Sequence, residues 1–229
     1  MRLDKLLAHK GYGTRKEVKK IIKQGNVLVN QQVIVDDNYK VNLDNDVVKV
    51  FDEVIQYQKY VYIMLNKPSG YVCATSDLNH PTVIELINQY YVNLSPVGRL
   101  DLDTEGLLLL TNDGQFAHQV ISNKKFIPKV YYVELLNDFD ISFIKDIENG
   151  IWLNENEQVR PAKIEIVDHK TIYLTITEGK YHQIKRMNHS CNNEVSYLKR
   201  VKIGQLELDN LLELGEYRFL SESEKMMFK

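Results

Sequence analysis

The sequence predicts an α+β fold with two domains: a small N-terminal domain of residues 1–58 and a larger domain of residues 59–229 around a mixed, mainly antiparallel sheet. A chain of 229 residues with 44% hydrophobic content can build more than one core. The poorly apolar segment "FDEVIQYQKY" separates two regions whose patterns differ. In the second region, strands are joined by turns or single helices without a regular strand-helix-strand repeat.

The N-terminal domain is expected to contain a helix followed by short strands. Thr14 and Glu17 form a T-x-x-E capping box, and Gly25 is placed to end the helix that they start. After it, "NVLVNQQVIV" alternates like two short strands about a tight turn, and "DDNYKVNLDNDVVKV" supplies another strand.

Positive charge is concentrated at the start of the chain, although the net charge is −2. Residues 1–25 contain eight Lys or Arg against two acidic residues, and residues 26–58 reverse the sign. In the predicted helix, Val18, Ile21 and Ile22 share the core side. The opposite side carries four lysines: Lys16, Lys19, Lys20 and Lys23. This local positive charge, which the net charge of the whole chain hides, favours a polyanionic partner.

The segment "RLDKLLAHKGYGTRKEVKKIIKQGNVLVNQQVI" resembles the S4 RNA-binding domain. The resemblance implies that the basic helical face contacts RNA through Arg15, Lys16, Lys19, Lys20 and Lys23. Relatives often have Asn-Gly at the turn, whereas here Gln31 follows Asn30. Positive φ at both positions would strain glutamine, so we expect a longer or differently shaped turn.

The larger domain alternates strands and helices in an irregular order. The expected strands are "VYIMLNKP", "GLLLLT", "KVYYVELL", "AKIEIVDHKTIYLTIT" and "VKIGQLELDN", and the expected helices are "TVIELINQ", "QFAHQVIS", "DISFIKDIENG" and "HQIKRMNHSC".

The last of these helices is a second basic element. If residues 182–191 are helical, one face carries His182, Lys185, Arg186 and His189, and the other carries Ile184, Met187 and Cys191. Alone, this is typical of a solvated surface helix. Two basic helical faces in two domains favour one extended polyanion.

Composition and motifs argue against several other classes. No apolar run approaches the ~20 residues of a membrane span, so we expect a cytoplasmic protein with no membrane partner. Cys73 and Cys191 lack the spacing of a zinc or redox site, and H-x6-H-x-C at His182 to Cys191 matches no familiar ligand set. The stretch "GRLDLDTEG" lacks the x5-E of a calcium loop, and G-x-S-x-G is absent from the sequence. We therefore expect no metal.

Carboxylate chemistry at "GRLDLDTEG" remains after these exclusions. Asp101 with Asp103 or Glu105 could be offered as a glycosidase pair, but neighbours on one loop seldom face each other across a substrate. The alternative is one ionised carboxylate that acts at a sugar C1′ or on a nearby proton and has a basic partner from another segment.

The stretch "GRLDLDTEGLLLLTNDG" resembles the active-site motif of the pseudouridine synthases, in the branch that includes ribosomal small- and large-subunit enzymes. "LNKPSG", "KVYYV" and "EGKYHQIKRM" match the other family motifs in order. The resemblance implies that Asp101 is catalytic, that Tyr131 packs against the target base, and that Lys185 pairs with Asp101 and keeps it ionised. Arg99 would position the RNA, and further RNA-binding candidates are Lys67, Lys180, His182 and Arg186. Asp103 and Glu105 would be framework.

The implied reaction is the isomerisation of uridine to pseudouridine in RNA after the base has flipped out, without a cofactor. Lys-Tyr-His in "EGKYHQIKRM" resembles the small-subunit form of the motif, so the resemblance implies 16S rRNA, presented in a pre-30S ribosomal particle, as the partner of a monomeric enzyme. A 23S rRNA enzyme and a non-catalytic S4-type RNA-binding or ribosome-assembly protein are the alternatives. Attack of Asp101 on C1′ and elimination through the 2′ position both stay open.

Overall fold

A computed structural model describes the chain except for residues 44, 56–59, 90, 123–125 and 229. It divides into two compact units, each with its own core. The first comprises residues 1–61 and 88–93, and the second comprises residues 62–87 and 94–229. The predicted boundary between residues 58 and 59 lies outside the described residues.

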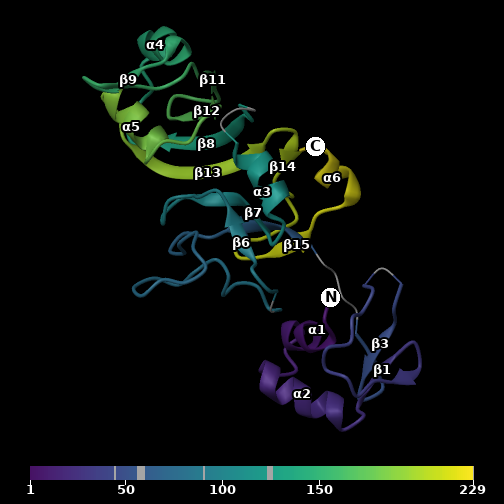
Figure 1. The fold of residues 1–229 in the computed structure, drawn as a ribbon. Coiled ribbons are helices and arrows are strands. Elements are labelled where there is room, and N and C mark those ends of the chain that lie inside the picture. The colour runs from purple at the N-terminus through teal and green to yellow at the C-terminus, as the bar shows by residue number, and fades with distance from the viewer. Residues whose placement is uncertain (44, 56–59, 90, 123–125, 229) are drawn as a thin grey trace. The chain divides into compact units, whose positions relative to one another are not determined.

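The first unit combines two helices with a four-stranded antiparallel sheet (Figure 1). The helices are α1 (Leu3–His9) and α2 (Arg15–Lys23), and the strands are β1 (Val27–Val29), β2 (Gln32–Val33), β3 (Val48–Val50) and β4 (Glu53–Val54), in the order β2-β1-β3-β4. The capping box is confirmed, because the Thr14 hydroxyl accepts from the Glu17 N–H and the Glu17 carboxylate accepts from the Thr14 N–H. Val18 and Ile22 are buried in the core, as the helical pattern predicts.

The turn between β1 and β2 differs from the prediction. Val29 pairs with Gln32, so the turn has two residues, and both Asn30 and Gln31 have positive φ, at 49° and 70°. The Asn30 side chain accepts from the Val47 N–H and donates to the Asp46 carboxylate, both within 2.9 Å. These tertiary bonds hold the hairpin tip in the left-handed region, whose cost for glutamine is about 1–2 kcal/mol.

The second unit is built on a mixed, mainly antiparallel sheet, as predicted. Across the described residues its strand order is β11-β12-β8-β13-β7-β5-β15, with β14 beside β13 and β6 beside β7. The strands are β5 (Tyr62–Lys67), β6 (Ser95–Val97), β7 (Glu105–Thr111), β8 (Lys129–Leu135), β11 (Lys163–Ile166), β12 (Thr171–Ile176), β13 (Val195–Ile203), β14 (Leu206–Glu207) and β15 (Tyr217–Phe219). Among these, β13 and β7 pair in parallel, and the other pairs are antiparallel. A separate hairpin joins β9 (Trp152–Asn154) to β10 (Glu157–Gln158).

The helices of this unit are short. They are α3 (Gly114–Ile121), a 3-10 turn η1 (Ile141–Phe143) that continues into α4 (Ile144–Asn149), α5 (Gln183–Ser190) and α6 (Glu222–Met226). In the part of the chain that the structure describes, no helix is both long and apolar enough to cross a membrane.

The helix expected at "TVIELINQ" does not form. Thr82 and Glu85 make a T-x-x-E contact like that of a helix start, with the Thr82 N–H donating to Glu85 Oε1 at 2.8 Å. However, the Val83 N–H donates to the Val72 carbonyl at 3.0 Å, and the segment is a run of turns. A tertiary backbone partner therefore ends the helix that the local signal starts.

Strand β7 is the centre of the unit. Leu107, Leu108, Leu109 and Leu110 are all buried, because β7 lies between β13 and β5 and is covered on both faces. Gly106 has a φ of +97°, and a Cβ there would meet the Arg200 carbonyl oxygen at 2.3 Å. Glycine is thus required where β13 joins β7, directly after the loop "GRLDLDT".

Candidate active site

A buried lysine anchors the loop that carries Asp101. Lys67, at the end of β5, is 0% exposed. Its Nζ donates to four backbone carbonyl oxygens at 2.8–3.2 Å, those of Pro68, Asp101, Leu102 and Thr104. Burial lowers the pKa of Lys67, and nearby acidic groups partly offset this effect. The prediction that Lys67 binds RNA is wrong, because the ammonium group is enclosed and has internal partners.

Two further hydrogen bonds fix the same loop. The Leu100 N–H donates to Cys73 Sγ at 3.2 Å, and the Gly70 N–H donates to the Leu102 carbonyl at 2.9 Å. Burial raises the pKa of the Cys73 thiol, so this cysteine is a packed, protonated acceptor. The loop backbone is thereby held from three sides before β7 begins.

The Asp101 carboxylate lies between two basic side chains of a distant segment. Its Oδ1 is 3.7 Å from His182 Nε2, and its Oδ2 is 3.9 Å from Lys185 Nζ. The Asp101 side chain is 29% exposed, and no hydrogen bond to it is found within the described residues. The carboxylate therefore has positive charge beside it and oxygens that remain open to a substrate.

Lys185 has a closer partner than the one predicted. Its Nζ donates to both oxygens of Asp103, at 2.5 and 2.6 Å, whereas Asp101 is the longer contact. Partial burial acts to raise the pKa of Asp103, but the hydrogen bond and charge of Lys185 outweigh it and leave that pKa below its usual value. Asp103 thus fixes Lys185 beside Asp101.

The third carboxylate of the motif has a different partner. The Tyr197 hydroxyl of β13 donates to Glu105 Oε2 at 2.7 Å. Burial, followed by this hydrogen bond, raises the pKa of Tyr197. Glu105 therefore links β7 to β13 and does not reach the Asp101 cluster through any contact in the described chain.

Tyr131 lies on β8 at the level of the loop. It is buried, and its Cα is in register with Arg200 of β13, which is in register with Gly106 of β7. Since neighbouring strands are ~4.8 Å apart, Tyr131 lies about 10 Å from the start of β7. Tyr132 packs edge to face against Tyr173 on the opposite face, consistent with a structural role.

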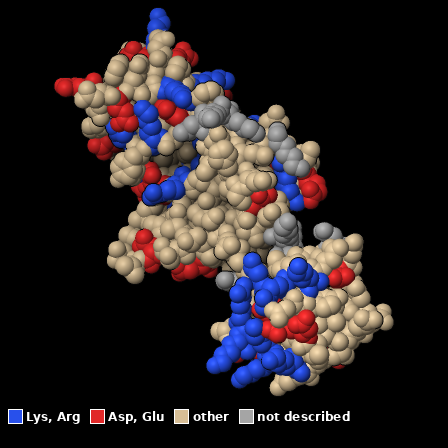
Figure 2. Space-filling model, viewed as in Figure 1, with Lys and Arg blue, Asp and Glu red and all other residues tan. Residues whose placement is uncertain are grey.

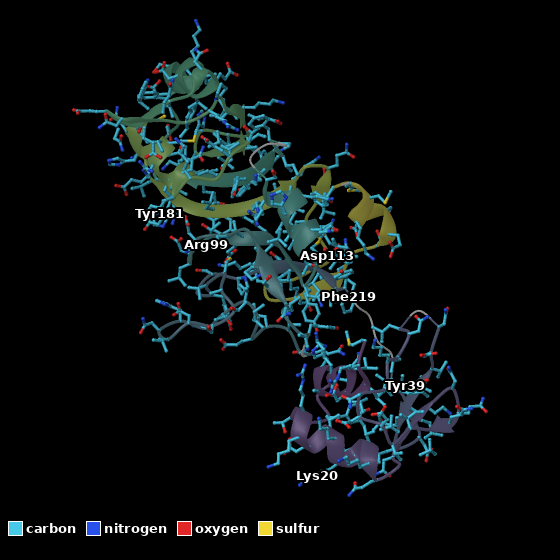
Figure 3. All side chains as sticks on the ribbon, viewed as in Figure 1. Lys20, Tyr39, Arg99, Asp113, Tyr181 and Phe219 are labelled. Carbon is cyan, nitrogen blue, oxygen red and sulfur yellow. The ribbon has the colours of Figure 1, made fainter. Side chains whose placement is uncertain are left out.

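Two of the predicted RNA-binding cations have internal partners. Arg186 forms a short hydrogen-bonded ion pair with Glu157 of β10, and Lys180 lies 3.5 Å from the same carboxylate. The Arg186 hydrogen bond is the main reason why the pKa of Glu157 is low. Arg186 therefore binds the β9-β10 hairpin to α5, and Lys180 binds it to the turn before α5. Arg99 is exposed on the loop that leads into Asp101 (Figure 3).

A separate hollow of about 510 Å³ lies on the sheet face of Tyr132. Its wall includes Tyr173, Lys199 and Asn66, and none of the predicted site residues lines it. Among the described residues, no group of three or more His, Cys, Asp or Glu could hold a metal ion. The Asp101 cluster is therefore the candidate site.

The comparisons with known proteins bear directly on this site. The family model of the RNA pseudouridylate synthases matches residues 61–190, which include Asp101, Tyr131 and Lys185. The chain belongs to the RNA pseudouridine synthase family. An S4 domain model matches residues 1–48, so this pseudouridine synthase has an N-terminal S4 domain.

Relatives of this pseudouridine synthase match almost its full length. It is 46% identical to "Uncharacterized RNA pseudouridine synthase YtzG" of Bacillus subtilis, with 98% of this chain and 96% of that protein covered. It is 38% identical to "Ribosomal small subunit pseudouridine synthase A" of Haemophilus influenzae and 37% identical to the Escherichia coli protein of that name, with 97% and 98% of them covered. A crystal structure titled "Crystal structure of pseudouridylate synthase" has a TM-score of 0.70 and 38% identity over both full chains.

The basic face of the S4 domain is visible in Figure 2, where Lys and Arg gather over α1 and α2. Lys19 pairs with Asp37 at 2.7 Å and is thus partly neutralised. Arg15, Lys16, Lys20 and Lys23 are exposed, and the described residues provide no ion pair to any of them. These four cations are the available phosphate contacts of the predicted stripe.

Sequence reasoning missed two parts of the pseudouridine synthase site. Asp103 holds Lys185, although it was regarded as framework alone. Gln183 is buried, and its amide fixes the turn before α5 by accepting from the Lys180 N–H and donating to Glu178. The Glu-x4-Gln spacing was visible, but its meaning depends on His182 adopting the left-handed conformation.

Proposed function

We propose that this pseudouridine synthase isomerises a uridine of 16S rRNA and that Asp101 is its catalytic carboxylate. The observation that carries the proposal is the Asp101 cluster. An anchored loop presents a carboxylate without a hydrogen-bond partner in the described chain, and His182 and Lys185 lie within 3.9 Å of it. A carboxylate acts on a ribose in its ionised form, and Lys185 supplies a cation next to it.

The reaction is balanced without any group donor. The bond from N1 of uracil to C1′ breaks, the uracil turns within the site, and a bond from C5 to C1′ forms. The C5 proton leaves and N1 gains one, so substrate and product have the same composition. Asp101 acts on the ribose side of this exchange.

Access to Asp101 requires the uridine to leave its stack. Base flipping costs a few kcal/mol, which contacts to the extruded nucleotide and to the backbone must offset. Tyr131, at the level of the loop, is the proposed packing partner of the uracil, and exposed Arg99 is the proposed RNA contact beside Asp101. Lys185, held by Asp103, is the proposed cationic partner of the Asp101 carboxylate.

The choice of 16S rRNA rests on the relatives and on the Lys-Tyr-His of "EGKYHQIKRM". Several matched proteins, at 37–42% identity, bear the name ribosomal small subunit pseudouridine synthase A. We propose that the modified uridine corresponds to position 516 of 16S rRNA. We propose that it is presented in a pre-30S ribosomal particle to a monomeric, cytoplasmic enzyme.

The first prediction concerns Asp101. Asp101→Asn keeps the shape but removes the charge, so pseudouridine formation should fall by about 10⁴-fold or more while RNA affinity changes little. The measurement is the release of tritium from RNA labelled at uridine C5, together with a filter-binding assay.

Asp103→Asn is the matched control. It removes an equally charged side chain two residues away but keeps one oxygen that can accept from Lys185 Nζ and hold it beside Asp101, so activity should fall by less than about tenfold. If Asp101→Asn is active, or if Asp103→Asn loses as much activity as Asp101→Asn, the catalytic carboxylate has been assigned wrongly.

The substrate is tested in cells. Pseudouridines are mapped in 16S and 23S rRNA with and without the gene, and again with the Asp101→Asn variant restored. Loss of one 16S position that only the wild-type gene restores supports the proposal. A missing 23S position instead identifies a large-subunit enzyme, and an unchanged map supports the non-catalytic alternative.

A further inference from the structure

An exposed aromatic pair lies next to the candidate catalytic carboxylate. The rings of Tyr181 and His182 are stacked, with centroids 3.8 Å apart and an angle of 18° between the planes. Tyr181 is 75% exposed, although one face of its ring is covered by His182. Since most of the residue is exposed, the other face of the ring is open to solvent.

The inner end of this stack contacts the site. His182 Nε2 lies 3.7 Å from Asp101 Oδ1, so the order of groups is Asp101, His182, Tyr181 and then solvent. The two stacked rings therefore begin beside the Asp101 carboxylate and end in an open ring face, on which one more flat group could stack.

The turn that carries the pair is held rigidly. The Gln183 side chain accepts from the Lys180 N–H at 2.9 Å and donates to Glu178 at 3.1 Å. Arg186 Nη1 donates to the Tyr181 carbonyl at 3.3 Å. Because the backbone of Tyr181 is fixed before any ligand arrives, little conformational entropy would be lost when a flat group stacks on the ring.

We propose that the outer face of Tyr181 is a stacking subsite for one unpaired base of the substrate RNA, belonging to a nucleotide near the target uridine. The proposal rests on the proposed function and adds a second point of RNA recognition to it. A base that lies ~3.5–4 Å beyond Tyr181 is two ring spacings from His182. It is therefore too far from Asp101 to be the reacting uracil, but it is within reach of an adjacent nucleotide.

The chemistry of the surface favours a base over an apolar protein side chain. The open group is a planar ring whose hydroxyl end is polar, and it stacks on His182, which together with Lys185 lies beside Asp101. Stacking on tyrosine tolerates any of the four bases, because each presents a π-face. The subsite thus requires a nearby base that is not stacked within the RNA, but it does not distinguish which of the four bases it is.

The experiment uses the full chain and a transcribed 16S rRNA fragment that contains the mapped uridine. Tyr181→Ala should raise KM for the fragment by about 5- to 100-fold and leave kcat within about threefold, because the lost contact lies away from the reacting atoms. Tyr181→Phe should stay within about twofold of wild type in both constants. Tyr181→Leu should behave like Tyr181→Ala, because it is apolar but cannot stack.

Phe219→Ala is the control for the loss of an exposed ring. Phe219, labelled in Figure 3, lies on the edge strand β15 and is 47% exposed. Its substitution should leave KM and kcat unchanged.

A second readout reports stacking directly. 2-Aminopurine is placed in turn at each nucleotide that flanks the uridine, and its fluorescence is followed during binding. At one position, wild type and Tyr181→Phe should quench the signal and Tyr181→Ala should not. An active wild-type enzyme whose KM and quenching survive Tyr181→Ala, or are restored by Tyr181→Leu, overturns the subsite and leaves the proposed function intact. A wild-type enzyme that modifies neither this fragment nor a pre-30S particle overturns the proposed function first.

Discussion

At the scale of single residues, Lys67 gives the motif "LNKPSG" a structural role in place of the predicted RNA contact. The ammonium group donates to the carbonyl oxygens of Pro68, Asp101, Leu102 and Thr104, so one side chain braces a turn that is also closed by the Thr104 N–H donating to the Asp101 carbonyl at 3.1 Å. A buried cation is costly unless it is solvated by the protein, and here backbone dipoles provide that solvation. Its role is to position Asp101.

We predict that Lys67→Met destabilises the second unit and inactivates the enzyme. Methionine has a similar length but no donors, and buried carbonyls that lose their partner cost about 1–3 kcal/mol each where the site cannot relax. The free energy of unfolding should fall by about 2–4 kcal/mol, and activity should fall at least tenfold in protein that remains folded. Urea unfolding and tritium release measure the two effects. Lys199→Met serves as the control, and full activity in a folded Lys67→Met protein would refute the positioning role.

At the scale of elements, the C-terminal helix is tied to the sheet by one guanidinium. Arg218 of β15 donates to Asp209 at 2.5 Å and to Glu224 of α6 at 2.8–3.0 Å. Glu224 also closes the capping box with Ser221. The hydrogen bonds from Arg218 are the largest cause that lowers the pKa of Glu224 to about 2.

This pairing predicts an acid-dependent loss of stability. Because the pKa of Glu224 is lowered from 4.5 to about 2 on folding, its contribution is complete above pH 4.5 and is lost as the pH falls to about 2. Glu224→Gln should therefore reduce the free energy of unfolding by about 1–3 kcal/mol at pH 7, with the difference shrinking in that acidic window. Urea unfolding at a series of pH values tests this. Exposed Glu222→Gln should match wild type, and a difference that is independent of pH would exclude the pairing as its cause.

Elements defined by short-range signals could be predicted from the sequence. The T-x-x-E box and the leucine run gave α2 and β7, because each signal is contained within its own segment. The helix predicted at residues 82–89 was wrong, because the carbonyl of the distant Val72 accepts the Val83 N–H and prevents the helix from continuing. Lys67 and Asp103 were misjudged for the same reason: Lys185 and Asp103 are 82 residues apart, and no local pattern encodes their contact. The motifs located the candidate site, but only the fold shows which side chains are free to meet RNA.

At the scale of the whole molecule, the chain has a basic face on its S4 domain and a neutralised basic helix in its catalytic domain. Lys180, Arg186 and Lys185 each have carboxylate partners, whereas Lys16, Lys20 and Lys23 have none within the described residues. Counterion release on RNA binding should therefore come mainly from the S4 domain.

We predict that the triple variant Lys16→Gln, Lys20→Gln and Lys23→Gln binds rRNA more weakly and with a lower salt dependence. Each lost phosphate contact should reduce the slope of log K against log salt by about 0.7–0.9. The value of kcat should be unchanged. The charge-matched control is Lys145→Gln, Lys163→Gln and Lys170→Gln in the catalytic domain, and an equal slope for the two triple variants would mean that the stripe is only solvated.

The parallel contact between β13 and β7 at Gly106 also has a consequence for the order of folding. It joins the strand that follows α5 to the strand that follows the Asp101 loop, so Lys185 can reach Asp103 only after two segments far apart in the chain have met. Closing so long a loop is slow compared with forming the neighbouring hairpins. During refolding, catalytic competence should therefore appear as one of the last events, and a nascent chain should remain inert until its C-terminal strands have emerged.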